Sequence, residues 1–263
     1  MSQLHPLESV FAEHLPRWLQ WPAVARFFGI PATVGMLRSL GPQPSYGGAL
    51  QGLGASVAVE GLEHLPSTGP LVVVANHPFS MIDVLSVGTA VEQRRAPGSV
   101  RAVVDRASAA LVELHPLMCF VGDDPAGREA FWRDALGHLE EGGAVVMFPA
   151  GHSVKRDRYG VALETPWRGG ALKLAARSGA CLLPAHVAAP SRRRYQFLRR
   201  RLDRQVVQKL NLREAARFRD TARVRFGAPL RGEGLTPDGL RDQIYRLGGE
   251  PFRLAEGSRS APR

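Results

Sequence analysis

The sequence predicts an α/β fold with a mainly parallel, twisted sheet covered by helices on both faces, and with an N-terminal helical extension. After about residue 50, strand-like and helix-like segments alternate along the chain. Two of the strand-like segments, 71–75 and 144–148, are continuously apolar, as expected for strands buried on both faces. The 263 residues, of which 44% are hydrophobic and 22% charged, suffice for one domain with a sizeable core.

The elements follow from apolar runs and from the Gly and Pro residues between them. Residues 1–50 read as short helices broken by prolines, ending in a Gly/Pro-rich linker over 41–48. The expected strands are 55–60, 70–75, 99–104, 118–122, 143–148, 180–187 and 222–226. The expected helices are 82–94, 106–113, 125–141, 168–178, 205–219 and 236–247. We therefore divide the chain into an N-terminal segment (1–50), a main domain (51–250) and a tail (251–263) expected to be disordered because it has little to bury.

A histidine and a carboxylate directly follow one of the apolar runs, where residues 76–83 read NHPFSMID. On a straight helix, six steps of about 100° would place His77 and Asp83 far apart. The two can meet only if His77 precedes the helix, and Pro78 favours that arrangement. Asp83 would then fix the tautomer of a general base, His77. The alternative is a buried histidine and a helix-start aspartate that never touch.

Ser80 lies between these two residues. No Gly-x-Ser-x-Gly motif surrounds it, so the sequence does not favour a serine hydrolase. We expect Ser80 to make a hydrogen bond at the start of the helix.

Further motifs lie in order along the chain: VEGLEHLP at 59–66, FPAGHS at 148–153 and LLPAHV at 182–187. Together with the His77 motif they resemble the glycerolipid acyltransferases, a superfamily that includes 1-acylglycerol-3-phosphate O-acyltransferase. The resemblance covers roughly residues 55–230. It implies transfer of an acyl chain from a thioester to the hydroxyl of a lysolipid.

Two departures from the usual family pattern bear on the acceptor. The spacing here is His-x5-Asp instead of His-x4-Asp, and Ala150 and the pair 152–153 replace the Glu and the Thr-Arg of the third motif. Both departures are similar to those of a divergent, hemolysin-like branch. They remove two groups that the family uses around the glycerol phosphate. Lysophosphatidate is the default acceptor, and a lyso-aminolipid is the main rival.

The resemblance also implies where substrate binds. The polar head of the acceptor is expected near the loop after residue 147, where Gly151 allows close backbone approach. Basic residues just beyond this loop could replace the missing Arg, and Arg128 is the nearest candidate for the arginine of the second motif. The expected substrate-binding residues are Asn76, Ser80, Arg128, Phe148, Pro149, Gly151, His152, Ser153, Lys155 and Arg156. Arg158 is a further basic candidate, and His186 stands where the family has an apolar residue.

The positive charge of the chain is concentrated in one segment. Between Arg192 and Arg225 there are 13 Arg and Lys residues against three acids, which equals the whole net charge of +10. Such a segment favours a polyanionic partner, either a nucleic acid or an anionic membrane surface. No nucleic-acid-binding motif accompanies it, so we expect anionic membrane lipids as partner and no nucleic acid.

The N-terminal segment adds a second membrane signal. Residues 15–28 mix aromatic and basic side chains as an interfacial helix does, although the same residues could instead pack on the catalytic domain. We see no secretory signal and no apolar run of the ~18 residues needed to cross a bilayer. The many Arg and few Lys residues suggest a bacterial source. We expect a peripheral or monotopic protein on the cytoplasmic face of the bacterial inner membrane.

The sequence thus predicts a membrane-associated O-acyltransferase that uses acyl-CoA or acyl carrier protein, with no further cofactor and no obligate protein partner. Cys119 and Cys181 are too far apart in sequence for a CxxC motif, and the histidines lack ligand spacing, so neither a disulfide nor a metal site is expected. Three alternatives stay open: a non-catalytic lipid-binding protein on the same scaffold, a basic nucleic-acid binder, and a thioesterase in which water replaces the acceptor.

Overall fold

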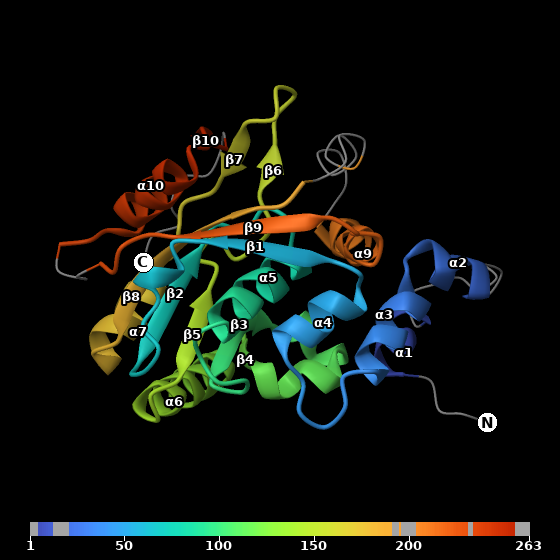
Figure 1. Cartoon of the computed structure of the whole chain (residues 1–263). Helices are drawn as coiled ribbons and strands as arrows, with labels where there is room; N and C mark the ends of the chain where they lie inside the picture. Colours follow the sequence, from blue (N-terminus) through green and yellow to red (C-terminus); the bar gives the residue numbers. More distant parts are fainter. Residues whose placement is uncertain (1–4, 13–20, 191–194, 196–203, 231–233, 256–263) are drawn as a thin grey trace.

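A seven-stranded sheet forms the centre of the protein, with strand order β1-β9-β8-β2-β5-β3-β4 (Figure 1). The computed structural model describes residues 5–12, 21–190, 195, 204–230 and 234–255. Each strand of this sheet lies within one residue of its predicted bounds. The strands are β1 (Ser56–Glu60), β2 (Leu71–Ala75), β3 (Val100–Asp105), β4 (Met118–Val121), β5 (Ala144–Met147), β8 (Cys181–Ala188) and β9 (Thr221–Phe226).

The sheet is mainly parallel, as predicted. Every neighbouring pair is parallel except β8 and β9, which are antiparallel. In the middle of the sheet, Val73 of β2 lies between Val146 of β5 and Leu183 of β8. The carboxyl ends of β8, β2, β5, β3 and β4 therefore meet at one edge, where open α/β sheets place their ligands.

Helices cover both faces of the sheet, which explains why its central strands are apolar throughout. Alternate residues of β2 belong to two separate hydrophobic clusters, Val73 to one and Val72 and Val74 to the other. The first cluster includes α5 (Met81–Glu92) and α4 (Tyr46–Gly52). The second includes α6 (Pro125–Glu140), α7 (Gly170–Ser178) and α10 (Pro237–Gly248). Both sides of the predicted layered fold are thus present.

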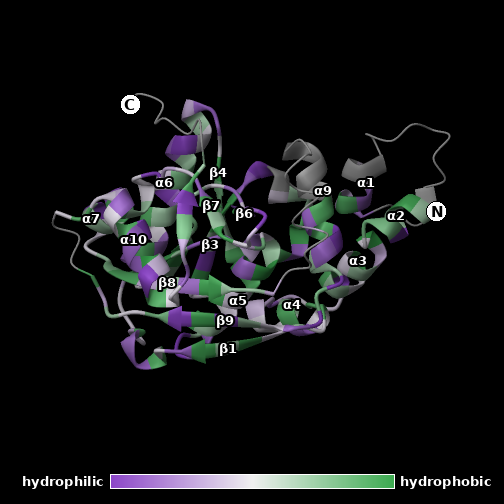
Figure 2. Ribbon diagram, turned by 90° about the horizontal axis from the view of Figure 1, so that it is seen from above, coloured by the Kyte–Doolittle hydropathy of each residue, from purple (hydrophilic) through white to green (hydrophobic). Residues whose placement is uncertain are grey.

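The N-terminal helices lie at one end of the molecule, beside α9 (Arg204–Ala215), as Figures 1 and 2 both show. They are α1 (Pro6–Ala12), α2 (Trp21–Phe27) and α3 (Ile30–Arg38), followed by α4. Ile30 and Leu37 of α3 and Tyr46 of α4 are buried in the same cluster as one face of the sheet. Among the described residues, no helix is long and apolar enough to cross a membrane.

Three segments differ from the predicted elements. Residues 106–113 form no α-helix; two 3₁₀ segments, η2 (Arg106–Ala110) and η3 (Val112–Leu117), link β3 to β4, and η3 contains Pro116, which cannot continue an α-helix. The helix predicted over 205–219 ends at Ala215. The linker predicted over 41–48 ends early, because Ser45 caps α4 by accepting a hydrogen bond from the Gly48 N–H at 3.0 Å.

A second, three-stranded sheet was not predicted. It has the order β10-β7-β6 and consists of β6 (Lys155–Arg156), β7 (Ala162–Glu164) and β10 (Phe252–Leu254). β10 lies in the segment for which the sequence predicts disorder; it is ordered because it pairs in parallel with β7. The rest of that tail, 256–263, lies outside the described residues.

Candidate active site

The turn after β2 begins with an asparagine that ties two strands together. Asn76 is buried, and both ends of its amide bond the backbone of Val187 in β8: Oδ1 accepts from the N–H at 2.7 Å and Nδ2 donates to the carbonyl at 3.0 Å. Its amide is thus used within the protein, and its predicted contact with substrate stays a prediction. The effect is to fix the exit of β2 at the carboxyl edge of the sheet.

The structure brings His77 and Asp83 together. The His77 Nδ1 lies 3.0 Å from Asp83 Oδ2, although the ring is not turned for a linear N–H···O bond. Asp83 is fully buried in the first turn of α5, and the same Oδ2 accepts the backbone N–H of Phe79 at 2.5 Å. Because His77 precedes the helix, the six-residue spacing closes a tight turn and the two groups meet.

The His77 ring packs on one side against an aromatic side chain, and one of its nitrogens has no hydrogen-bond partner among the described residues. It packs against the ring of Phe148, with 4.5 Å between centroids and a 34° tilt. The His77 carbonyl accepts the N–H of Val154 at 2.7 Å, which joins this turn to the loop after β5. No group among the described residues hydrogen-bonds Nε2.

Ser80 occupies the N-cap position of α5, but its side chain makes no capping hydrogen bond, contrary to the prediction. Its φ of 62° and ψ of −125° make it the only non-glycine residue with positive φ in the described part of the chain. Such backbone is strained for a residue with a Cβ, and strain of this kind clusters at functional sites. Ser80 adopts this conformation within the sharp turn between His77 and Asp83.

The loop after β5 lies beside the histidine. Its Phe148 supplies the ring against His77, and its Pro149 carbonyl accepts the backbone N–H of Arg168 at 3.2 Å. Ala150, which replaces the Glu of the usual motif, is buried in the second hydrophobic cluster. Gly151 is exposed and has a φ of 70°, so a side chain there would be strained.

The end of this loop touches α9. Ser153 Oγ lies 3.3 Å from Asn211 Nδ2, and Asn211 in turn accepts the hydroxyl of Tyr195. His152 is exposed. The loop predicted to bind the acceptor head is thus held between His77 on one side and α9 on the other.

The basic residues predicted to contact substrate are placed differently from one another. Arg156 pairs with Glu250 and donates to the Gly160 carbonyl at 2.9 Å, so its charge is used within the protein. Arg128 donates to the backbone carbonyl of Asp123. Lys155 is exposed at the start of β6. Two of the three predicted cations therefore have partners other than a substrate.

An arginine that sequence reasoning missed lies at the turn where the second motif was expected. Gly122 and Gly127 pack so closely that a Cβ on either would come within 2.8 Å of the other's Cα. Arg106 stands against this pair, at the end of the neighbouring strand β3. The hydrogen bond from the Gly127 N–H is the main cause that lowers the pKa of Asp124, and the charge of Arg106 lowers it further. The signal for Arg106 was its place directly after a strand that ends at the carboxyl edge.

His186, for which the sequence suggested no role, belongs to an ionic cluster at the end of α10. Its Nε2 lies 3.0 Å from Glu250 Oε2, and Glu250 also pairs with Arg156. Burial raises the pKa of Glu250, but the hydrogen bond from His186 and the charge of Arg156 outweigh burial and leave the pKa below its usual value. This cluster joins β8, β6 and α10.

A cavity of about 380 Å³ lies next to the His77 turn and is lined in part by Phe79. Phe79 packs on the rings of Tyr195 and Phe218, at centroid distances of 5.9 and 5.5 Å. The lining residues are Phe79, Pro190, Glu214, Arg217, Phe218, Arg219 and Asp220. Within the described residues, no group of three or more His, Cys, Asp or Glu could hold a metal ion, and both cysteines are free thiols.

The fold and the His77–Asp83 pair define an α/β protein with a paired histidine and carboxylate at the carboxyl edge of its sheet. Residues 56–188 match the family model described as Acyltransferase, and the chain belongs to that family. Among solved structures, the chain is similar to the 1-acyl-sn-glycerophosphate (LPA) acyltransferase, PlsC, from Thermotoga maritima, with 16% identity and a TM-score of 0.49 over 91% of this chain and 86% of that one. No curated protein matches the sequence.

Proposed function

We propose that this acyltransferase moves an acyl chain from acyl-CoA or acyl carrier protein to the hydroxyl of a lysolipid, with lysophosphatidate as the default acceptor. The observation that carries the proposal is the His77–Asp83 contact of 3.0 Å in a chain of the Acyltransferase family. A histidine oriented by a carboxylate on one nitrogen can take a proton on the other.

The proposed reaction needs no covalent enzyme intermediate. The acceptor hydroxyl gives its proton to His77 Nε2 as its oxygen bonds to the thioester carbonyl carbon. The tetrahedral intermediate then collapses, the C–S bond breaks, and the proton passes from Nε2 to the departing thiolate. Asp83 keeps the other proton on Nδ1 and stabilises the imidazolium while it exists. Donor and acceptor supply all the reacting atoms, so no further cofactor is proposed.

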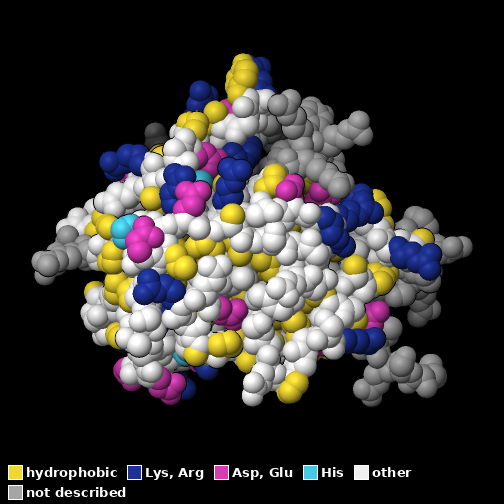
Figure 3. Space-filling view, in the orientation of Figure 1, with side chains coloured by type: hydrophobic (Ala, Val, Ile, Leu, Met, Phe, Trp, Pro, Cys, Tyr) yellow, Lys and Arg dark blue, Asp and Glu magenta, His cyan; other side chains and the backbone are white. Residues whose placement is uncertain are grey.

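The proposed place of the reaction is a membrane surface, where both lipids are found. Phe27 of α2 is 50% exposed, and the guanidinium of Arg213 lies 4.5 Å from its ring centre. Figure 3 shows Lys and Arg side chains toward the end of the molecule that holds α9 and the N-terminal helices. An exposed aromatic ring among cations suits the headgroup boundary of an anionic leaflet. The cytoplasmic face of a bacterial inner membrane, with no nucleic acid and no obligate protein partner, is part of this proposal.

The test is transfer of a labelled acyl group from acyl-CoA or acyl carrier protein to a panel of lysolipids. The panel contains lysophosphatidate, a lysophosphatidylethanolamine, monoacylglycerol and a lyso-aminolipid without phosphate. Label in a diacyl product supports the proposal and identifies the acceptor. Label found only in free fatty acid would indicate a thioesterase. Lipid binding without any turnover would indicate a non-catalytic lipid-binding protein.

A further inference from the structure

The loop predicted to hold the acceptor head contains no cation of its own. Residues 148–153 read FPAGHS, so the arginine of the usual motif is absent. Arg156 is paired with Glu250, and Arg158 stacks on Tyr159 at 4.7 Å from its ring centre. Neither residue is placed to replace the missing charge above Gly151.

Arg168, which is far from this loop in sequence, reaches it in space. A Cβ built on Gly151 would lie 3.7 Å from Arg168 Cζ and 3.8 Å from Nη1, so the guanidinium lies within van der Waals contact of the Cβ position of Gly151. The residue is exposed, and no acid among the described residues pairs with it. The N-terminal end of α7, which begins two residues later, adds the positive end of its helix dipole.

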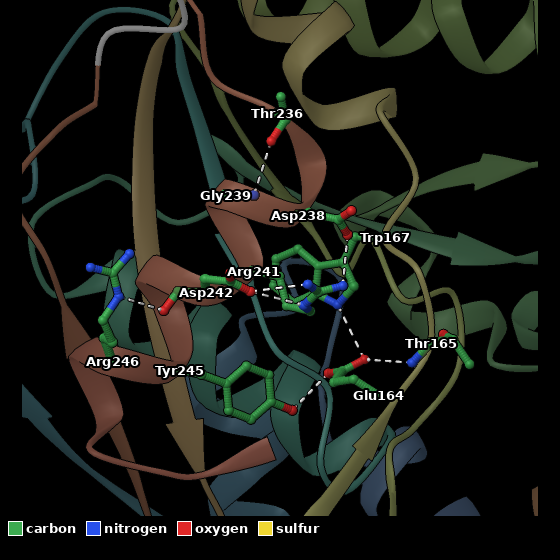
Figure 4. Close-up of polar contacts among 10 residues, drawn as sticks. All are labelled: Glu164, Thr165, Trp167, Thr236, Asp238, Gly239, Arg241, Asp242, Tyr245 and Arg246. Carbon is green, nitrogen blue, oxygen red and sulfur yellow. Dashed lines mark hydrogen bonds and ion pairs between the residues drawn. The ribbon is translucent and has the colours of Figure 1, made fainter. Parts of the chain in front are cut away.

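The main chain at Arg168 is held firmly from two directions. Its N–H donates to the Pro149 carbonyl at 3.2 Å, which joins it directly to the loop. The preceding residue, Trp167, is buried and donates its indole N–H to Glu164 at 3.2 Å. Figure 4 shows Trp167 and Tyr245 converging on the Glu164 carboxylate, which accepts the Tyr245 hydroxyl at 2.7 Å. With the backbone anchored in this way, anion binding by the guanidinium would have to order only the side chain.

We infer that Arg168 binds the phosphate group of the acyl acceptor over the exposed backbone of Gly151. The guanidinium fork matches phosphate oxygens in a bidentate manner. The loop connects this position to the base: Phe148 packs on the His77 ring, and Val154 donates to the His77 carbonyl. The inference rests on the proposed function, and it selects phosphate-bearing lysolipids over acceptors without phosphate.

The experiment compares two acceptors that share a glycerol and an acyl chain, lysophosphatidate and monoacylglycerol. Hydrogen bonds to charged groups are strong enough that Arg168→Ala should raise KM for lysophosphatidate at least tenfold. The KM for monoacylglycerol should be unchanged, and Arg168→Lys should restore part of the loss, since it keeps the charge without the fork. Lys173→Ala, an exposed cation on α7, is the matched control and should behave as wild type.

A binding arm separates this inference from the proposed function. Isothermal titration calorimetry would measure the binding signal of glycerol 3-phosphate, inorganic phosphate and glycerol on the wild type and on Arg168→Ala. Signal from glycerol 3-phosphate that is lost in Arg168→Ala supports the inference; equal signal from inorganic phosphate would mean a site for free phosphate and not for an acceptor head. Binding unaffected by Arg168→Ala, or equal loss of turnover on both acceptors, overturns it. Absence of any transfer by the wild type would instead refute the proposed function.

Discussion

Asp83 acts on two groups with one oxygen. It lies 3.0 Å from the His77 ring and accepts the Phe79 N–H, so the same carboxylate contacts the proposed base and closes the turn that carries it. The turn itself depends on Ser80, whose backbone is in a region that favours glycine. The contact between His77 and Asp83 is therefore maintained at a cost in backbone strain.

Ser80→Gly should relieve this strain. We expect the free energy of unfolding to rise by about 1 kcal/mol, because strained backbone of this kind costs on the order of 1–3 kcal/mol and the greater chain entropy of glycine offsets part of the gain. Urea unfolding of the wild type, Ser80→Gly and Ser80→Ala measures it. Ser80→Ala keeps the Cβ and should match the wild type. A Ser80→Gly protein less stable than Ser80→Ala would contradict this account.

At the scale of elements, α10 is joined to the two sheets by Glu250. Its lowered pKa means that its contribution to stability is present above the unfolded value of 4.5 and is lost as pH falls through the folded value. Glu164 has the opposite effect on stability. Burial raises its pKa, so the stability that its protonated form contributes is lost as pH rises. Comparison with a Glu250 variant isolates the first effect, because Glu164 is present in both proteins.

Glu250→Gln should therefore destabilise the protein in a pH-dependent way. Near pH 7 the expected loss is about 1.5–3 kcal/mol, the range for hydrogen bonds to charged groups. The difference from wild type should shrink as pH falls below 4.5. Urea unfolding at several pH values between 7 and 3.5 provides the test. A difference independent of pH would show that the ionised form of Glu250 does not stabilise α10.

The contact between α4 and α5 gives a second prediction at this scale. A Cβ on Gly88 would lie 2.2 Å from the ring of buried Tyr46, so Gly88→Ala should cost about 1–3 kcal/mol through overpacking. The same change at Gly137 of α6 meets nothing within 4 Å and should gain up to about 1 kcal/mol from helix propensity. Thermal unfolding of both variants measures whether stability falls in Gly88→Ala and rises in Gly137→Ala. A stabilised Gly88→Ala would mean that α4 does not pack there.

The elements that could be predicted are those whose signal is local. All seven strands of the main sheet were identified, because runs such as Leu71–Ala75 are apolar on both faces. β6, β7 and β10 were missed, since a short strand of charged residues such as Lys155–Arg156 has no apolar pattern. The His77–Asp83 pair was visible from spacing and Pro78. Arg168 was not, because its approach to Gly151 depends on how the chain between them folds back.

At the scale of the whole molecule, the proposed membrane face lies where α2 meets α9. Phe27→Ser should weaken binding to anionic vesicles about tenfold, since a buried Phe contributes on the order of 1.5–3 kcal/mol. A point change is preferable to a deletion of the N-terminus because Ile30 and Leu37 belong to the core. Tyr159→Ser, which alters a 71% exposed ring on the β6–β7 hairpin, is the control. Vesicle sedimentation that responded to Tyr159→Ser and not to Phe27→Ser would place the membrane at the hairpin.

The initial rate of labelled acyl transfer to the best acceptor, in the wild type and in His77→Ala, tests the central claim most directly. His64→Ala serves as control, because His64 lies on the segment before β2 and not at its carboxyl end. The account predicts a loss of at least about 10²–10⁴-fold in His77→Ala, the usual contribution of a general base, with unfolding unchanged and His64→Ala fully active. Wild-type turnover from a folded His77→Ala protein would contradict it.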